Sequence, residues 1–178
     1  MVKINLKEVI RTIPHFPKEG IMFRDITTLL QDPKAFSFVI EEFYERYKNA
    51  NISSVVGIES RGFILGGAVA YCLNAGFVPI RKKGKLPYKT TSVEYELEYG
   101  KDIIEIHSDS IKKSDKVLLV DDLIATGGTA LAATNLVKKL GGDIVECAFI
   151  VELPDLHGRE KIENRGYNVF SLVKFEGG

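Results

Sequence analysis

The sequence predicts an α/β fold in which a mainly parallel central sheet carries helices on both faces. Segments typical of strands alternate along the chain with segments of helical periodicity, as in βαβ units. The runs at 53–58 and 117–120 are short and apolar rather than alternating, which is typical of strands covered on both faces. The 178 residues are 45% hydrophobic and 27% charged, so the chain can form the core of one globular domain.

The first half of the chain begins with a segment of helical spacing. Leu6, Val9, Ile10 and Ile13 recur at the intervals of one helix face, which predicts a short helix ended by Pro14. We expect 15–31 to be a loop. Asp32-Pro33 predicts the N-cap and first position of a helix that extends to Asn49. The further elements predicted here are a strand at 53–58, a helix at 62–74 closed by Ala75-Gly76, and a strand at 77–81.

The second half contains one departure from the parallel pattern. The basic segment 82–91 is predicted to be an exposed, mobile loop, because it holds Gly84 and Pro87. In 93–99 apolar and aromatic residues alternate with glutamates, so this segment and 102–107 predict an antiparallel hairpin. The remaining predicted elements are a strand at 117–120, a helix from about 127 to 140, and strands at 144–151 and 167–175.

Composition excludes several classes of protein. The chain has 24 lysines and arginines and 24 aspartates and glutamates, so its formal net charge is zero. A zero net charge does not favour a nucleic-acid or membrane-surface binder. Cys72 and Cys147 lie in apolar runs, and we expect both to be buried thiols. The N-terminus lacks the apolar core of a signal peptide, and the apolar run at 62–73 is too short to span a membrane. We therefore expect a cytoplasmic protein.

The most informative segment is 117–129, VLLVDDLIATGGT. A buried strand brings its carboxyl end to the sheet edge where α/β proteins bind ligands. Gly127 and Gly128 allow backbone N–H groups to approach an anion, and the following helix adds its positive N-terminus. Residues 125–129, here called the phosphate loop, are therefore predicted to bind a phosphate. Asp121 and Asp122 would repel a phosphate, so we expect them to face sugar hydroxyls or a cation that develops on a sugar.

Simpler interpretations account for this segment less well than ligand binding does. An acidic turn before a capped helix would leave Asp121 and Asp122 merely solvated, but it does not account for the full order of strand, two aspartates and TGGT. A Walker A loop is excluded because no lysine follows the glycines, and no GxGxxG dinucleotide motif occurs in the chain.

The segment 117–129 resembles the phosphoribosyl pyrophosphate (PRPP) signature of the type I phosphoribosyltransferases. Further blocks are similar to the adenine phosphoribosyltransferase branch of that family: FPKEGIMFRDIT at 16–27, Asp32-Pro33, GIESRGF at 57–63, RKKGKLP at 81–87, YELEYG at 95–100, and VEL at 151–153 before GRE at 158–160. The resemblance covers nearly the whole chain. It implies the type I phosphoribosyltransferase fold, with a small hood and a flexible β-hairpin lid, and the conversion of adenine and PRPP to AMP and pyrophosphate with Mg²⁺.

The resemblance implies a PRPP site made of several loops. The ribose hydroxyls would contact Asp121 and Asp122. The leaving pyrophosphate would be bound near Glu59, Ser60 and Arg61, with a non-proline cis peptide between the first two, and by Arg81 and Lys85. A solvated basic loop remains the alternative for the lysines. The 5′-phosphate would sit on Ala125, Thr126, Gly127, Gly128 and Thr129. No residue is expected to bind Mg²⁺ directly, because the ion prefers substrate oxygens and water.

The resemblance also implies how the base is recognised. Phe23 would stack on adenine, Leu153 would close the other side, and the backbone around Met22 and Arg24 would bond the purine edge. Without the resemblance, Phe23 and Leu153 fit equally well as core residues. Glu98, with Tyr99 beside it in the lid, would handle the proton at the imidazole nitrogen of adenine, although spacing alone does not separate it from Glu94 and Glu96. The catalytic residues are thus expected to be Glu98, Asp121, Asp122 and Arg61.

The predicted organisation is one domain over 1–178, with a hood for base recognition at 1–32 and a lid hairpin at 82–107. The resemblance implies a homodimer in which the neighbouring subunit contributes Arg81 near the pyrophosphate. The partners expected are the small molecules adenine and PRPP, with no nucleic acid and no membrane. Two alternatives stay open: a phosphoribosyltransferase for hypoxanthine, xanthine or orotate, and a non-catalytic regulator that senses PRPP.

Overall fold

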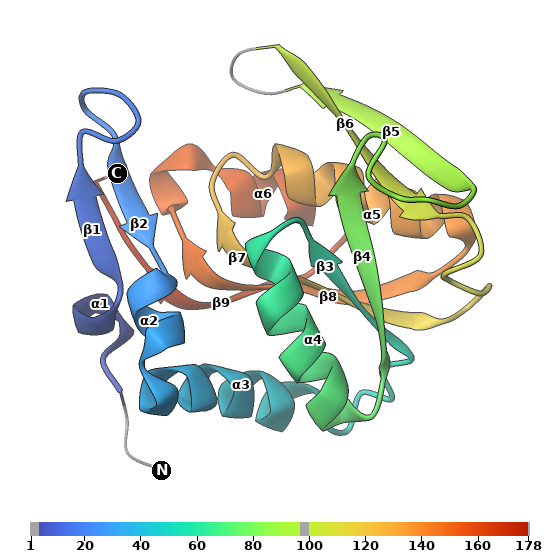
Figure 1. The fold of residues 1–178 in the computed structure, drawn as a ribbon, viewed down its shortest axis with the longest axis horizontal. Helices are drawn as coiled ribbons and strands as arrows, with labels where there is room; N and C mark the ends of the chain where they lie inside the picture. The colour runs from blue at the N-terminus through green and yellow to red at the C-terminus, as the bar shows by residue number, and fades with distance from the viewer. Residues whose placement is uncertain (1–3, 97–99, 178) are drawn as a thin grey trace.

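A seven-stranded sheet runs through the centre of the computed structural model, which describes residues 4–96 and 100–177 (Figure 1). In spatial order its strands are β5 (Thr90–Glu96), β6 (Lys101–His107), β4 (Gly76–Lys82), β3 (Ser54–Ile58), β7 (Lys116–Ile124), β8 (Asp143–Glu152) and β9 (Val169–Lys174). The five neighbouring strands β4, β3, β7, β8 and β9 pair in parallel. β6 pairs antiparallel with both β4 and β5. The predicted parallel sheet with one antiparallel hairpin is confirmed.

Helices cover both faces of the sheet, as predicted. On one face, α3 (Pro33–Tyr47) and α4 (Arg61–Leu73) pack against alternate strand residues such as Val55 and Leu118. On the other, α5 (Gly128–Leu140) and α6 (Gly158–Glu163) pack against their neighbours Val56 and Leu119. Successive side chains of a strand point to opposite faces, so each buried strand contributes to two cores. This explains why these strands are apolar without alternation.

The N-terminal segment differs from its prediction. Helix α1 (Leu6–Val9) ends before Ile10, and β1 (Arg11–Pro14) pairs antiparallel with β2 (Met22–Asp25), followed by α2 (Thr27–Gln31). The helix predicted to Ile13 and the loop predicted over 15–31 are therefore wrong. Pairing with β2 and the Arg11–Asp25 ion pair, 2.6 Å from Nη2 to Oδ2, favour the extended conformation over the helical spacing.

Two other boundaries follow from specific contacts. Helix α3 begins where predicted, because the Asp32 carboxylate accepts hydrogen bonds from the Lys34 and Ala35 amides at 2.8 and 3.2 Å. Strand β7 is longer than predicted and carries both aspartates, since its pairing with β8 continues to Ile124. The 3₁₀ turn at Pro154–Leu156 and the short helix α6 were not predicted, because such short pieces show no clear periodicity.

The two cysteines lie in different environments. Cys147 is buried in β8, as expected, but Cys72 is exposed, because it follows the exposed Tyr71 on the outer side of α4. The prediction that both are buried is wrong for Cys72. None of the helices in residues 4–96 and 100–177 has the length and apolar character needed to cross a membrane.

Candidate active site

The phosphate loop connects the end of β7 to the start of α5. Gly127 adopts a left-handed conformation, with φ of 72°, and its carbonyl accepts the Leu131 amide at 2.9 Å. This geometry turns the chain into α5 and leaves the first amides of the helix without partners inside the helix. Since α5 has 13 residues, its N-terminus provides a positive end at this point. The loop can therefore bind an anion by its backbone.

A pocket of about 530 Å³ lies in front of this loop. It contains all the residues predicted to bind PRPP except Arg81 and Lys85. Three segments line it: the turn from β3 into α4, the end of β7 with the phosphate loop, and the β4–β6 region. The predicted residues among them are Glu59, Ser60, Arg61, Asp121, Asp122, Ala125, Thr126, Gly127, Gly128 and Thr129.

The two aspartates differ in their partners. The side chain of Asp122 is 7% exposed, and its Oδ2 lies 2.7 Å from Arg61 Nε. That contact is an ion pair without hydrogen-bond alignment, and within the described part of the chain this oxygen has no hydrogen-bond partner. Asp121 is half-buried, and its Oδ1 accepts the Asp122 amide at 2.9 Å. The Asp122 carboxylate is thus neutralised by Arg61, and Asp121 has the more accessible side chain of the two.

Burial controls the ionisation of both aspartates. Burial, and then the charge of Asp122, raise the pKa of Asp121 well above its ordinary value. Burial also raises the pKa of Asp122, although the Arg61 guanidinium opposes part of this effect. Positive charge on a ligand beside these carboxylates would lower both pKa values again. The pair is therefore arranged to respond to a cation.

Arg81 and Lys85 do not line the pocket but contact Glu59, which does. Lys85 Nζ lies 2.6 Å and Arg81 Nη2 3.3 Å from Glu59 Oε1, and the Lys82 amide donates to Oε2 at 3.0 Å. Burial pushes the pKa of Glu59 up, but these hydrogen bonds outweigh it and lower the pKa to about 2. The Glu59–Ser60 peptide is cis, as the resemblance implied. Two predicted cations are thus held at the edge of the pocket by one carboxylate.

The hairpin contributes residues that were not predicted as site residues. Lys82, Tyr95 and Asp102 line the pocket, and Lys82 Nζ lies 3.0 Å from Asp102 Oδ2. Tyr95 is paired with Asp102 across β5 and β6. The alternation in 93–99 already placed Tyr95 on the less polar face, which was the available signal. Glu98 and Tyr99 lie outside the described residues.

The residues predicted to bind the base lie beside the pocket and do not line it. The Arg61 guanidinium lies 5.6 Å from the centre of the Phe23 ring, so this cation joins Phe23 to Asp122. Phe23 also packs edge-on against Phe16, with the ring centres 5.2 Å apart. The Leu153 amide donates to the Ile124 carbonyl at 3.0 Å, which fixes Leu153 next to the end of β7.

Met22 and Arg24 flank Phe23 on β2. Met22 is half-buried, whereas Arg24 is buried, where its Nη1 donates to Thr12 at 2.6 Å and its guanidinium lies 4.4 Å from the Phe175 ring centre. The Arg24 side chain therefore braces the β1–β2 hairpin, in which Arg24 is the register partner of Thr12.

Residues 4–96 and 100–177 hold no group of three or more histidine, cysteine, aspartate or glutamate side chains that could bind a metal ion. Four carboxylates line the pocket, and three of them, those of Glu59, Asp102 and Asp122, are paired with a lysine or arginine. Among the described residues, the fourth, Asp121, has no ion pair of this kind. One or two carboxylates plus substrate oxygens are typical of Mg²⁺ sites. These residues therefore fit a magnesium ion that is bound mostly through its substrate.

Comparisons with known proteins agree on one family. Residues 25–178 match the model of the phosphoribosyl transferase domain. The chain is 58% identical over 174 residues to an adenine phosphoribosyltransferase of Desulfosudis oleivorans, covering 98% of this chain and 99% of the relative. It is similar to the crystal structure of adenine phosphoribosyltransferase from Rhodothermus marinus, with a TM-score of 0.90, 51% identity and 96% of each chain covered.

A third similar structure contains ligands. It is the adenine phosphoribosyltransferase from Saccharomyces cerevisiae complexed with D-2,5-dideoxy-2,5-imino-altritol 1,6-bisphosphate and adenine. Its TM-score is 0.88 at 41% identity, and the match covers 94% of this chain and 96% of that one.

Proposed function

The chain belongs to the phosphoribosyl transferase domain family and, within it, to the adenine phosphoribosyltransferases, and we propose that it converts adenine and PRPP to AMP and pyrophosphate. The observation that carries this proposal is one pocket in which two carboxylates adjoin a glycine-containing helix N-terminus. A sugar phosphate can be bound there at both ends, by its hydroxyls on Asp121 and Asp122 and by its phosphate on residues 125–129.

The aspartates then act on the charge that develops during the reaction. Breaking the bond between C1 and pyrophosphate leaves positive charge on the ribose ring. Preorganised anions next to such charge are effective because the protein has already oriented them before the reaction. Burial destabilises the ionised forms of Asp121 and Asp122. These ionised forms become more stable as the positive charge on the ribose grows. This supports a role in transition-state stabilisation.

The leaving pyrophosphate would bind cations that are paired with Glu59 in the free protein. Arg61 lines the pocket, and Arg81 and Lys85 stand next to it on Glu59. A phosphate oxygen arriving at this edge would offer Lys85 a second anion in its own subunit, whereas Arg81 would serve the pyrophosphate of the partner subunit, because guanidinium suits paired phosphate oxygens. When bound, Mg²⁺ would neutralise part of the negative charge on the pyrophosphate. Asp121 and Asp122 would be the protein groups nearest to it.

Adenine would occupy the space beside Arg61, between the hood and the end of β7. Phe23 would stack on the ring, Leu153 would pack on the other side, and the backbone of Met22 and Arg24 would bond its edge. Glu98 would hold the proton at the imidazole nitrogen, with Tyr99 beside it. This assignment is supported by the place of Phe23 next to Arg61 and of Leu153 next to Ile124.

We also propose the roles of the larger parts. The single domain over 1–178 would use 1–32 as the hood and 82–107 as a flexible lid that excludes water, which would hydrolyse a cationic ribose. Figure 1 shows the β5–β6 hairpin and the β1–β2 hairpin at opposite ends of the molecule. The chain would form a homodimer through the outer face of α4, where Tyr71 is 87% and Ile64 48% exposed, and Arg81 would reach the partner's site.

A pyrophosphate-release assay with purified protein, PRPP and Mg²⁺ tests the proposed function. We expect release that depends on adenine, together with formation of AMP. Hypoxanthine, xanthine and orotate, supplied in parallel, should give far less product. Preference for one of these bases would reject the assignment to adenine, and binding of PRPP without release would indicate a regulator.

A further inference from the structure

A second segment, residues 153–159, packs against the phosphate loop and against Ile124 at the end of β7. Its first residue is held by the bond from the Leu153 amide to the Ile124 carbonyl. At its other end, a Cβ on Gly158 would lie 2.1 Å from the Ala125 carbonyl oxygen and 2.8 Å from the Gly127 nitrogen. A Cβ on Gly127 would lie 2.7 Å from the Gly158 carbonyl oxygen. The two backbones are therefore in direct contact, with no room for a side chain.

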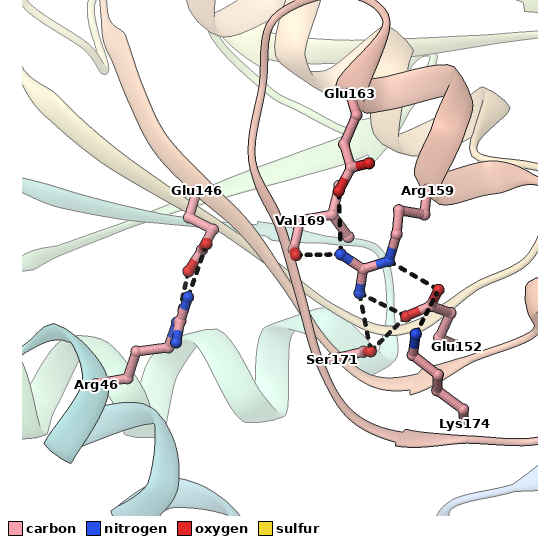
Figure 2. A network of polar contacts seen from close by, with 8 residues as sticks. All are labelled: Arg46, Glu146, Glu152, Arg159, Glu163, Val169, Ser171 and Lys174. Carbon is pink, nitrogen blue, oxygen red and sulfur yellow. Dashed lines mark hydrogen bonds and ion pairs between the residues drawn. The ribbon is translucent and has the colours of Figure 1, made fainter.

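The next residue, Arg159, ties this segment to the sheet (Figure 2). Its Nε and Nη2 donate to the two carboxylate oxygens of Glu152, at 2.8 and 2.6 Å. The same guanidinium donates to the Val169 carbonyl and to Ser171 Oγ on β9. The Glu152 side chain is only 4% exposed, at the end of β8. A planar, two-point contact of this kind fixes direction as well as distance.

We propose that Arg159 is a positioning residue for the phosphate loop, acting through Gly158. The guanidinium is anchored on the ends of β8 and β9, so it fixes where the Gly158 backbone stands, and that backbone sets how far Ala125 and Gly127 can move back. Arg159 does not line the pocket and would touch no substrate. This inference rests on the proposed function, because it assumes that residues 125–129 bind the 5′-phosphate.

The chemical reason is that backbone amides bind an anion well only in a narrow geometry. Displacements on the order of 1 Å at a binding site reduce rates and affinities by large factors. A lysine at position 159 would keep the charge but would lose the two-point contact with Glu152. We therefore expect Arg159→Lys to weaken phosphate binding by about tenfold, with a smaller effect on adenine.

The chain contains a matched control, also drawn in Figure 2. Arg46 on α3 binds Glu146 on β8 by the same two-point geometry, with Nε and Nη2 at 2.6 and 2.9 Å from the carboxylate oxygens. Glu146 is also largely buried, with 11% of its side chain exposed. Neither residue lines the pocket. Arg46→Lys therefore removes an equivalent contact without touching residues 153–159.

The experiment compares ribose 5-phosphate binding, measured by calorimetry, in wild type, Arg159→Lys and Arg46→Lys. We expect the Kd of Arg159→Lys to rise about tenfold and that of Arg46→Lys to stay within about twofold, even where both lose similar thermal stability. In steady-state assays Arg159→Lys should raise the KM for PRPP more than it changes kcat. Gly158→Ala should weaken binding in the same way, against Gly76→Ala, whose Cβ would meet nothing closer than 3.7 Å.

The results separate this inference from the proposed function. Equal Kd values for Arg159→Lys and Arg46→Lys would overturn the positioning role, whatever the enzyme's activity. Failure of wild-type protein to bind ribose 5-phosphate would overturn it as well. If the wild type binds ribose 5-phosphate but releases no pyrophosphate, the proposed function fails, and the calorimetric comparison still decides the role of Arg159. If Gly158→Ala does not fold, Arg159→Lys alone decides.

Discussion

Asp121 shows how a single side chain can reduce stability while serving a ligand. Its folded pKa lies above the unfolded value of about 4, because burial and Asp122 disfavour its charge. The ionised carboxylate therefore destabilises the fold at neutral pH, and this penalty disappears as the pH falls below the unfolded pKa. A group that lowers stability in the free protein is typical of a site arranged for a ligand.

Removing that charge should therefore separate stability from activity. We expect Asp121→Asn to raise the Tm at neutral pH. At about pH 3 we expect no gain, because Asp121 is then largely protonated in both the folded and the unfolded wild-type protein. Turnover should fall by at least about 100-fold, and further with Asp122→Asn. Scanning calorimetry at both pH values and the pyrophosphate assay measure these effects, with the exposed Asp109→Asn as control. Near-normal turnover would contradict the assigned role.

Glu98 is assigned by resemblance, and kinetics can test it against its neighbours. We expect Glu98→Gln to lower kcat more than it raises the KM for adenine, because an amide cannot exchange the proton. Glu96→Gln, two residues earlier in the sequence, is the matched control and should be close to wild type. A larger loss of kcat in Glu96→Gln would transfer the role to that residue.

Among the elements, the β1–β2 hairpin is where prediction from the sequence was least successful and where the base is proposed to bind. The ring of Phe23 is only half-buried, with Phe16 against its edge and Arg61 5.6 Å from its centre. A core residue would be covered on all sides. The exposed part of this ring therefore supports stacking against a ligand.

Truncating that ring should affect the two substrates differently. We expect Phe23→Ala to raise the KM for adenine by roughly tenfold, with a much smaller change for PRPP, since aromatic contacts contribute on the order of 1 kcal/mol beyond burial. Phe23→Tyr keeps the ring and should retain most of the affinity. Equal losses for adenine and PRPP would argue against stacking.

For the whole molecule, the exposed face of α4 is the strongest support for a homodimer. Ile64 and Tyr71 are seven residues apart and therefore lie on one side of the helix. We expect Tyr71→Glu to shift the sedimentation coefficient of a dimer toward that of a monomer. Tyr88→Glu changes another exposed tyrosine, 59% accessible in the loop after β4, and should leave the dimer intact. A wild-type monomer would refute the proposal.

The sequence could predict those features that depend on neighbouring residues. The buried strands, the cap of α3 by Asp32 and the turn at Gly127 follow from side-chain periodicity, a short-range hydrogen bond and a backbone angle. Most of the residues predicted to bind PRPP surround one pocket for the same reason, because they belong to two continuous strand-loop-helix segments. Their individual roles remain predictions.

Other features required contacts between distant parts of the chain. β1 forms because β2 pairs with it, Lys85 lies on Glu59 rather than in the pocket, and Gly158 meets Ala125 although 33 positions separate them. The secondary-structure propensity of a segment does not identify such pairs, because it depends on nearby residues and not on the distant partner. The order of residues by itself therefore determined the sheet and the glycine turn into α5, whereas only the tertiary structure determined the β1–β2 hairpin, the partners of Arg81 and Lys85, and the contact of Gly158 with the phosphate loop.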